Sequence, residues 1–164
     1  MAKTDSFFIR AIASTDTTNF VQTSIDLGAY VDALGKSVLR IHNIAVKYGG
    51  PLSSYAGPPG SNHTACFQLT TQSQTALVDA TDKSVISTGV MSVSTDAGTV
   101  VTMMNDSMDI APQNWNNGYL VGVEQIYLGI DQSADIFDDI AIVLECTVET
   151  LSSSAAMALA LSQQ

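Results

Sequence analysis

Residues 116–131 read NNGYLVGVEQIYLGID, and the hydrophobic pattern of this stretch decides the fold class. A turn signal, Asn117-Gly118, comes first. Apolar side chains then occupy both alternating sets of positions: Tyr119, Val121, Val123 and Tyr127 on one, and Leu120, Ile126, Leu128 and Ile130 on the other. A strand at a wet sheet surface is apolar on one side only. We therefore predict a mid-sheet strand over 119–130 whose second face is covered by a loop or by another subunit.

The last strand predicted by the sequence, 138–151, has the opposite character. Its apolar residues share one set of alternating positions and its polar residues share the other. The apolar set is Ile140, Ile142, Leu144, Cys146 and Val148, and the polar set is Glu145, Thr147 and Glu149. This alternation indicates one face on the core and one face toward water or a polar contact.

The remaining chain is rich in short strand patterns separated by turn residues. Further strands are expected over 6–13, 19–27, 37–48, 64–72, 84–94 and 98–104, and 75–79 fits a short strand or a turn. The hydrophobic phase of 37–48 slips near His42-Asn43, as a β-bulge would cause. Segments 49–63 and 105–115 are predicted loops, and 152–164 is a tail that is helical or forms an extended arm. The sequence thus predicts an all-β protein, a single jelly-roll β-sandwich of about eight strands in one domain, 1–164.

Composition narrows the range of partners. The chain has 6 basic and 16 acidic residues, a net charge of −10, and charged residues make up only 13% of it. A surface this acidic repels phosphate, so direct binding of nucleic acid is not expected. Ser and Thr supply 34 of the 164 residues, and such short side chains suit strands and contact surfaces. No signal sequence and no membrane-spanning segment is predicted.

Chemical motifs are few, and we expect no enzyme activity and no cofactor. The acidic segment DQSADIFDD could offer oxygen ligands to Ca²⁺, but it lacks the EF-hand spacing, and a solvated loop is the favoured interpretation. Cys66 and Cys146 each lie in an apolar run, which favours two buried thiols over a disulfide or a metal pair. His42 is expected to be a hydrogen-bonded sheet residue and His63 a solvated one. The carboxylates of the acidic segment are Asp131, Asp135, Asp138 and Asp139.

Two aromatic residues in polar loops are candidates for binding. Tyr55 lies in GGPLSSYAGPPG and Trp115 in PQNWNNG. Such residues can cap the end of a sandwich core, anchor a protein interface or stack against sugars. The sequence leaves all three roles open.

The order of these segments resembles that of small single jelly-roll capsid proteins of tail-less icosahedral double-stranded DNA viruses. The likeness is carried by the opening strands, VLRIHNIAVKYG, NGYLVGVEQIYLGID and DIAIVLECTVETL. The resemblance implies a non-enzymatic subunit of a virion, whose partners are copies of itself and other capsid proteins. Because residues 1–20 hold only Lys3 and Arg10 as cations, a shell over an inner membrane or another protein layer is expected, without direct genome packaging. The residues expected at inter-subunit contacts are Tyr55, Trp115, Tyr127, Phe137 and Leu161.

Two other functions remain open. One is a secreted or surface-displayed carbohydrate-binding sandwich, with Tyr55 and Trp115 as its platform and Ca²⁺ in the acidic loop. The other is a self-assembling protein of a non-viral filament or surface layer, which composition does not separate from a capsid subunit.

Overall fold

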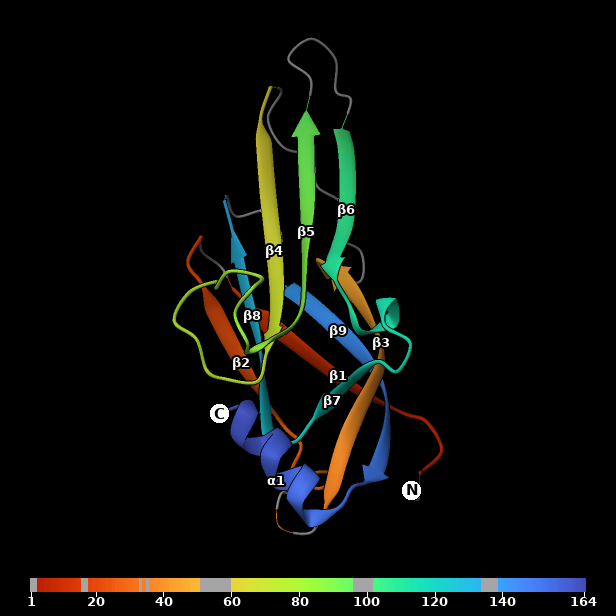
Figure 1. The fold of residues 1–164 in the computed structure, drawn as a ribbon. Coiled ribbons are helices and arrows are strands. Elements are labelled where there is room, and N and C mark those ends of the chain that lie inside the picture. The colour runs from red at the N-terminus through yellow and green to blue at the C-terminus, as the bar shows by residue number, and fades with distance from the viewer. Residues whose placement is uncertain are drawn as a thin grey trace.

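Two antiparallel sheets face each other in a computed structural model that describes residues 3–15, 18–32, 34, 36–50, 60–95, 102–133 and 139–164, with the side chains of 102–105 excepted. Its described residues form nine strands, a 3₁₀ turn and one C-terminal helix (Figure 1). In chain order these are β1 (Phe7–Ser14), β2 (Val21–Asp26), β3 (Ser37–Tyr48), β4 (Asn62–Thr70), β5 (Val85–Thr95), β6 (Thr102–Ile110), η1 (Pro112–Asn114), β7 (Tyr119–Val121), β8 (Gln125–Gln132), β9 (Asp139–Thr150) and α1 (Ser153–Ser162).

The strand order is that of a jelly roll. One sheet has the order β1-β9-β3-β7, and the other has the order β2-β8-β4-β5-β6. Strands from the first half of the chain pair with strands from the second half in reverse order: β1 with β9, β2 with β8, β3 with β7, and β4 with β5. This nested antiparallel pairing wraps one long folded hairpin into a sandwich, so the predicted fold class is confirmed. The β6 strand is a fifth strand at the edge of the second sheet.

The prediction of one continuous strand over 119–130 is wrong in an informative way. The chain leaves the first sheet after β7 and enters the second sheet as β8, with the corner at residues 122–124. One regular strand cannot belong to both of the facing sheets. The two alternating sets of apolar residues therefore lie largely on two different strands. Within β8 only Ile126, Leu128 and Ile130 form the fully buried apolar row.

Loops of the same chain cover the outer face of β8. A Cβ atom added to Gly129 would lie 2.7 Å from Cε2 of Phe20, so the phenyl ring rests directly on the strand. The connection 71–84 crosses this face, because it bonds to the strands on both sides of β8. The Gln68 amide of β4 exchanges two hydrogen bonds with the backbone of Val78, at 2.8 and 3.0 Å. The Gln22 side chain of β2 donates to Ser73 and accepts from the backbone of Gln74.

The core lies between the sheets and is almost entirely aliphatic. Phe67 is the largest of its fully buried side chains, and its ring meets that of Tyr48 edge-on at 6.4 Å. Opposite Phe67 in the register is Gly89, where an added Cβ would come within 2.6 Å of the Phe67 ring. The absent side chain at Gly89 therefore leaves the room that the phenyl ring fills.

The first sheet has the predicted irregularity in β3. The β3–β9 register shifts between Ile41 and Asn43, which confirms the β-bulge predicted near His42-Asn43. Gly118, with φ of +62°, makes the turn into β7 directly over this bulge. A Cβ there would meet the Ile41 carbonyl, so the Asn-Gly turn signal reflects a real steric requirement.

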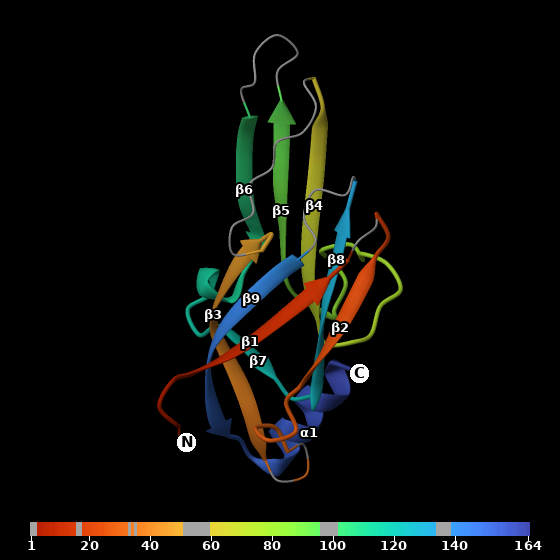
Figure 2. The ribbon, with the colours of Figure 1, turned by 180° about the vertical axis from the view of Figure 1, so that it is seen from behind.

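The region 102–110 also differs from its prediction. Residues 105–110 were expected in a loop, but they belong to β6, which pairs with β5. Asn, Asp and Ser are poor strand formers, and the pairing with β5 overrides their local preference. The strands β4, β5 and β6 run well beyond the ends of the other strands in both ribbon views (Figures 1 and 2).

The tail forms a helix, as one of its two predicted forms. Ser152 caps α1 by accepting a hydrogen bond from the Ala155 backbone. Ala156 and Ala160 are the buried helix residues, and the absent side chain at Gly122 lets Leu159 approach closely. Buried Gln163 then takes the place of a strand partner: it accepts from the Gly122 N–H at 2.8 Å and donates to the Leu120 carbonyl at 2.7 Å. The corner between β7 and β8 is thereby bonded to the tail.

Candidate assembly surface

The two sheets differ in how their outer faces are covered. The 71–84 connection lies over the β2-β8-β4 side, whereas no described segment crosses the middle of β1, β9 and β3, which lie toward the viewer in Figure 2. The side chains that point outward there form the surface that we call the β1–β9–β3 face. Its residues are Phe8, Arg10, Ile12, Asn43, Ala45, Lys47, Ala141, Val143 and Glu145.

The register places these side chains in three rows across the sheet. Phe8, Glu145 and Asn43 form the first row, Arg10, Val143 and Ala45 the second, and Ile12, Ala141 and Lys47 the third. The Arg10 guanidinium carbon lies 5.7 Å from the ring centroid of Phe8. Phe8 is 55% exposed and Ile12 is 52% exposed, although both lie in a regular strand. Large apolar side chains presented together on one sheet face are typical of a contact surface.

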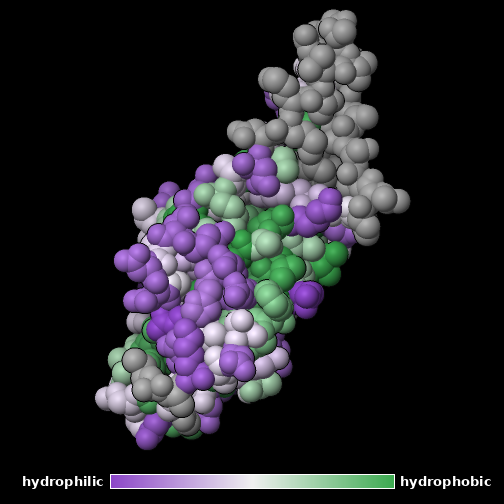
Figure 3. All heavy atoms as spheres, turned by 90° about the vertical axis from the view of Figure 1, so that its right-hand side faces the viewer, coloured by the Kyte–Doolittle hydropathy of each residue, from purple (hydrophilic) through white to green (hydrophobic). Residues whose placement is uncertain are grey.

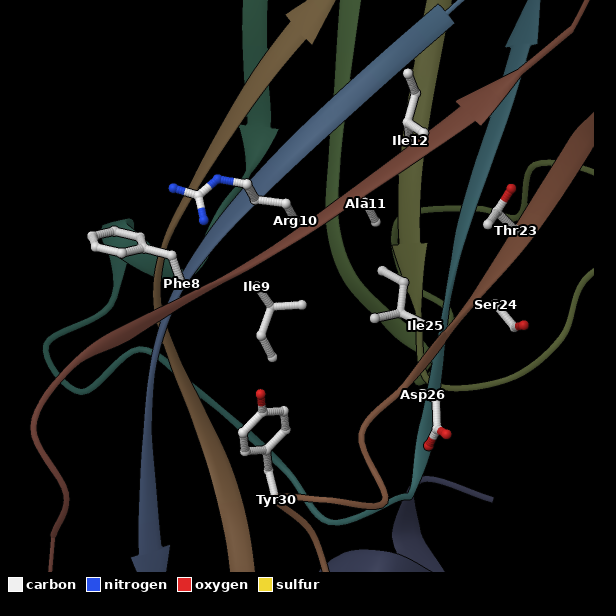
Figure 4. A pocket seen from close by; sticks show the side chains of 10 residues that line it. All are labelled: Phe8, Ile9, Arg10, Ala11, Ile12, Thr23, Ser24, Ile25, Asp26 and Tyr30. Atoms are coloured by element: carbon white, nitrogen blue, oxygen red, sulfur yellow. The ribbon is translucent and has the colours of Figure 1, made fainter.

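The same surface ends at an open edge. Strand β1 is the outermost strand of its sheet and β2 is the outermost strand of the other, so the sandwich is open between them. A groove of about 570 Å³ lies along this opening, with Ile9 and Ile25 directed into it and the Tyr30 hydroxyl pointing toward Ile9 (Figure 4). An eight-residue edge strand leaves every second backbone group available to another chain.

The other end of the first sheet's outer surface is polar and internally bonded. Arg40 holds Glu149 with two hydrogen bonds, Nε to Oε1 and Nη2 to Oε2, both at 2.7 Å. A third guanidinium nitrogen donates to the Asn117 carbonyl, and the Lys3 amine lies 3.7 Å from the same carboxylate. Glu149 is only 5% exposed, so this ion pair is buried at a place where a strand usually meets water.

The charges around Glu149 shift two titrations. The hydrogen bonds from Arg40, opposed in part by burial, hold the pKa of Glu149 below its ordinary value. His42 lies beside this group and shares a 2.9 Å hydrogen bond with the Thr147 hydroxyl, which confirms its predicted role as a bonded sheet residue. Burial, followed by the charges of Lys3 and Arg40, lowers the pKa of His42.

These shifts predict how stability changes with acid. Because the folded pKa of Glu149 is lowered, its contribution is present above the unfolded pKa of about 4.3 and is lost as the pH falls through the lower folded value. We expect Glu149→Gln to flatten the loss of stability below about pH 4.3, in urea unfolding measured by circular dichroism. The same change at exposed Glu124 controls for the loss of one charge; equal flattening in both variants would contradict the assignment.

The expected contact residues lie on separate elements. Trp115 follows η1, is 44% exposed, and packs against Tyr119 with ring centroids 5.9 Å apart. Tyr127 is half-buried on β8 with its hydroxyl donating to Gln125, and Leu161 is 65% exposed on α1. Tyr55 and Phe137 lie outside the described residues. The roles of all five residues in contacts stay predictions.

Phe8 and Ile12 were missed by the sequence reasoning, although their signal was present. In SFFIRAIA, residues Phe7, Ile9, Ala11 and Ala13 occupy one parity, and Phe8 and Ile12 the other. This is the same two-sided apolar pattern that was noticed in 116–131. In β1 the pattern has a different cause. Both alternating sets of apolar residues lie on the same strand, and the set with Phe8 and Ile12 faces outward.

The candidate Ca²⁺ ligands and the two cysteines have structural roles where the structure describes them. Asp139 accepts a 2.6 Å hydrogen bond from the Ser14 hydroxyl, and Asp131 accepts from the Gln132 backbone, whereas Asp135 and Asp138 lie outside the described residues. No group of three metal-ligating side chains occurs among the residues that the structure describes. Both cysteines are free thiols, buried for Cys146 and half-buried for Cys66. Burial raises the pKa of both thiols, to about 12 for Cys146.

A space-filling view of the side that carries β3, β6 and η1 shows a hydrophobic patch next to a band of hydrophilic residues (Figure 3). Among the described helices, none has the length and apolar character needed to cross a bilayer.

Comparison with known proteins gives little evidence on the fold or the function beyond what the strand order shows. No family model and no curated protein matches the chain. Among solved structures, a chain described as Desmodium yellow mottle tymovirus aligns over 89% of this chain and 86% of its own length, with 8% identity and a TM-score of 0.37. At that TM-score the similarity carries no argument, and the jelly-roll assignment rests on the pairing of the strands.

Proposed function

We propose that this chain is a structural, non-enzymatic capsid subunit that assembles with copies of itself into an icosahedral virus shell. The observation that carries the proposal is the β1–β9–β3 face, where Phe8 and Ile12 stand exposed on a regular edge strand of a jelly roll. Jelly rolls are a common architecture of viral capsids and also of lectins, so the surface, and not the fold alone, supports an assembly role.

The composition of the surface supports the same function. A contact of standard size covers about 800 Å² on each partner, with an apolar centre and a polar rim. On the β1–β9–β3 face, the apolar residues Ala45, Ala141 and Val143 lie beside the exposed Phe8 and Ile12 of β1, and its polar residues are Arg10, Asn43, Lys47 and Glu145. We place the protein in the virion, with other capsid proteins as further partners. The net charge of −10 favours a shell laid over an inner membrane or another protein layer over one in contact with the genome.

Particle mass tests the proposal. The purified chain is analysed by size exclusion with light scattering across a range of protein concentrations, and the same peak is imaged in negative stain. We expect closed particles or stable rings, with a mass many times that of the 17.3 kDa chain. A monomer at every concentration, alone and with co-expressed shell proteins, would overturn the capsid proposal. The carbohydrate-binding alternative would then be tested on a glycan array with Trp115→Ala as the comparison.

A further inference from the structure

Residues 3–6 form a short N-terminal arm that lies against the end of β9. The Thr4 backbone donates to the Val148 carbonyl at 3.1 Å, and the Val148 backbone donates to the Thr4 hydroxyl at 2.9 Å. Lys3 forms an isolated antiparallel bridge with Glu149. The arm is therefore paired with β9 as a short continuation of the edge strand β1.

A break in the ladder separates the arm from β1. The first pair of β1 is Phe7 with Cys146. Between that pair and the bridge at Lys3, three residues of the arm side face two residues of β9, which is the mismatch of a β-bulge. Asp5 and Ser6, at this bulge, are exposed. The arm can therefore open locally while the pairs of β1 stay intact.

His42 lies beside the arm on the outer surface of the same sheet. Its side chain shares a hydrogen bond with the hydroxyl of Thr147, which precedes the arm's partner Val148 on β9. His42 and Lys3 line one cavity of about 530 Å³, together with Arg40, Asn116, Asn117 and Glu149. The histidine and the arm thus share a polar cavity at the end of the sheet.

The charged groups that act on His42 are two cations and two carboxylates: Lys3 of the arm, Arg40 of β3, and Glu145 and Glu149 of β9. Burial lowers the pKa of His42, and the charges of Lys3 and Arg40 lower it further. The two carboxylates act in the opposite direction. A proton on His42 therefore adds a third positive charge to a group that is balanced without it.

Lys3 is the most weakly held of these cations. Arg40 makes two hydrogen bonds to the buried carboxylate of Glu149 and a third to the Asn117 carbonyl. The Lys3 side chain is 51% exposed, and its amine lies 3.7 Å from the same carboxylate. Arg40 and His42 also lie on β3, which is paired on both sides. Repulsion from a protonated His42 therefore acts on the arm.

We propose that protonation of His42 releases the N-terminal arm from β9, so that mild acid opens this end of the sheet. The inference concerns the single chain and does not depend on the proposed function. Release frees the backbone N–H and carbonyl of Val148, which Thr4 occupies in the docked arm. An unpaired strand edge of this kind is a ready site for another chain.

Linkage gives the direction of the pH dependence. Release takes the Lys3 charge away from His42 and so raises the pKa of the imidazole toward its ordinary value. Proton binding therefore favours the released arm, and docking weakens as the pH falls below about 6.5. Arg40 first, and Lys3 to a smaller extent, lower the pKa of Glu149, so this carboxylate adds to the weakening only below about pH 4.3.

Hydrogen exchange followed by mass spectrometry tests the proposal at the amides of Thr4 and Val148. The full chain is labelled at about pH 7.5 and about pH 5.5, with labelling times scaled to equal intrinsic exchange. Light scattering selects a concentration at which the chain is monomeric. We expect exchange of both amides, relative to the intrinsic rate, to rise at least about threefold at the lower pH. The amide of Ile142, in the middle of β9, stays unchanged. Equal protection of Thr4 and Val148 at both pH values would overturn the proposal.

His42→Gln is the matched control. Glutamine can still bond to the Thr147 hydroxyl but takes up no proton, so the acid response disappears above about pH 5. Lys3→Gln removes the repelled cation, and we expect the response to fall below about half of that of the wild type. Circular dichroism establishes that each variant is folded. A full response in either folded variant contradicts the proposal, and the exposed position of Lys3 keeps the test decisive if His42→Gln does not fold.

Discussion

Replacing Phe67 by alanine is expected to destabilise the fold by about 3–5 kcal/mol, the cost of a large aromatic deletion in a packed core. The ring is fully buried, meets Tyr48 edge-on, and occupies the space that Gly89 leaves. Strands from both sheets surround it, so the cavity cannot collapse without moving the sandwich layers. Urea unfolding followed by tryptophan fluorescence measures the change, and a loss below about 1 kcal/mol would show that the core repacks.

Phe8→Ala is the matched control for that experiment. It removes the same atoms from the same residue type, but from a side chain that is 55% exposed. We expect a change within about 0.5 kcal/mol in the free energy of unfolding of the monomer, as is usual for surface positions. A loss equal to that of Phe67→Ala would mean that Phe8 supports the fold and is not free for a partner.

Arg40→Met is the second large prediction, with an expected loss of about 3–5 kcal/mol at neutral pH, because it leaves a buried carboxylate without its main partner. Of its ion-pair partners in the described part of the chain, Glu149 would keep the Lys3 amine at 3.7 Å, and the hydrogen bond from Arg40 to the Asn117 carbonyl would also be lost. The turn before β7 would then lose its bond to β3. Thermal and urea unfolding at pH 7 measure the loss.

The double variant Arg40→Met with Glu149→Leu separates pairing from packing. Replacing both ions by apolar groups removes the unpaired charge, and such replacements are often neutral or stabilising. We expect the double variant to recover most of the stability that Arg40→Met loses. If both variants were equally unstable, the packing of the Arg40 stem or its bond to Asn117 would be the main contribution, and the ion pair would not.

Much of the fold follows from short-range patterns in the sequence. The alternation in 138–151 and the phase slip at His42-Asn43 are local signals, and both strands form where they were expected. The sheet change at residues 122–124 could not be found in this way. Apolar alternation reports which side of a strand is buried, but not which sheet the strand belongs to. The strand at 105–110 was missed for a related reason, because its pairing with β5 outweighs its polar composition.

The assembly surface was harder to predict than the core. Candidate contacts were sought mainly among aromatic residues of loops, together with Tyr127 on a predicted strand and Leu161 in the tail. The described surface with the clearest contact character lies instead on β1, β9 and β3. Burial in a sheet depends on partners distant in sequence: Arg10 meets Val143, and Val143 meets Ala45. The pattern of apolar and polar residues along one segment does not show which distant segment will lie beside it in the sheet.

The nested pairing also sets the order of events during synthesis. Phe7 pairs with Cys146, so β1 has no sheet partner until β9 has left the ribosome. Contacts this distant in sequence make folding slow, because a long loop must close before they form. Since β9 is the central strand of the β1–β9–β3 face, a chain that ends before β9 cannot build that surface. Topology alone would therefore keep such incomplete chains out of the proposed assembly, without any separate proofreading step.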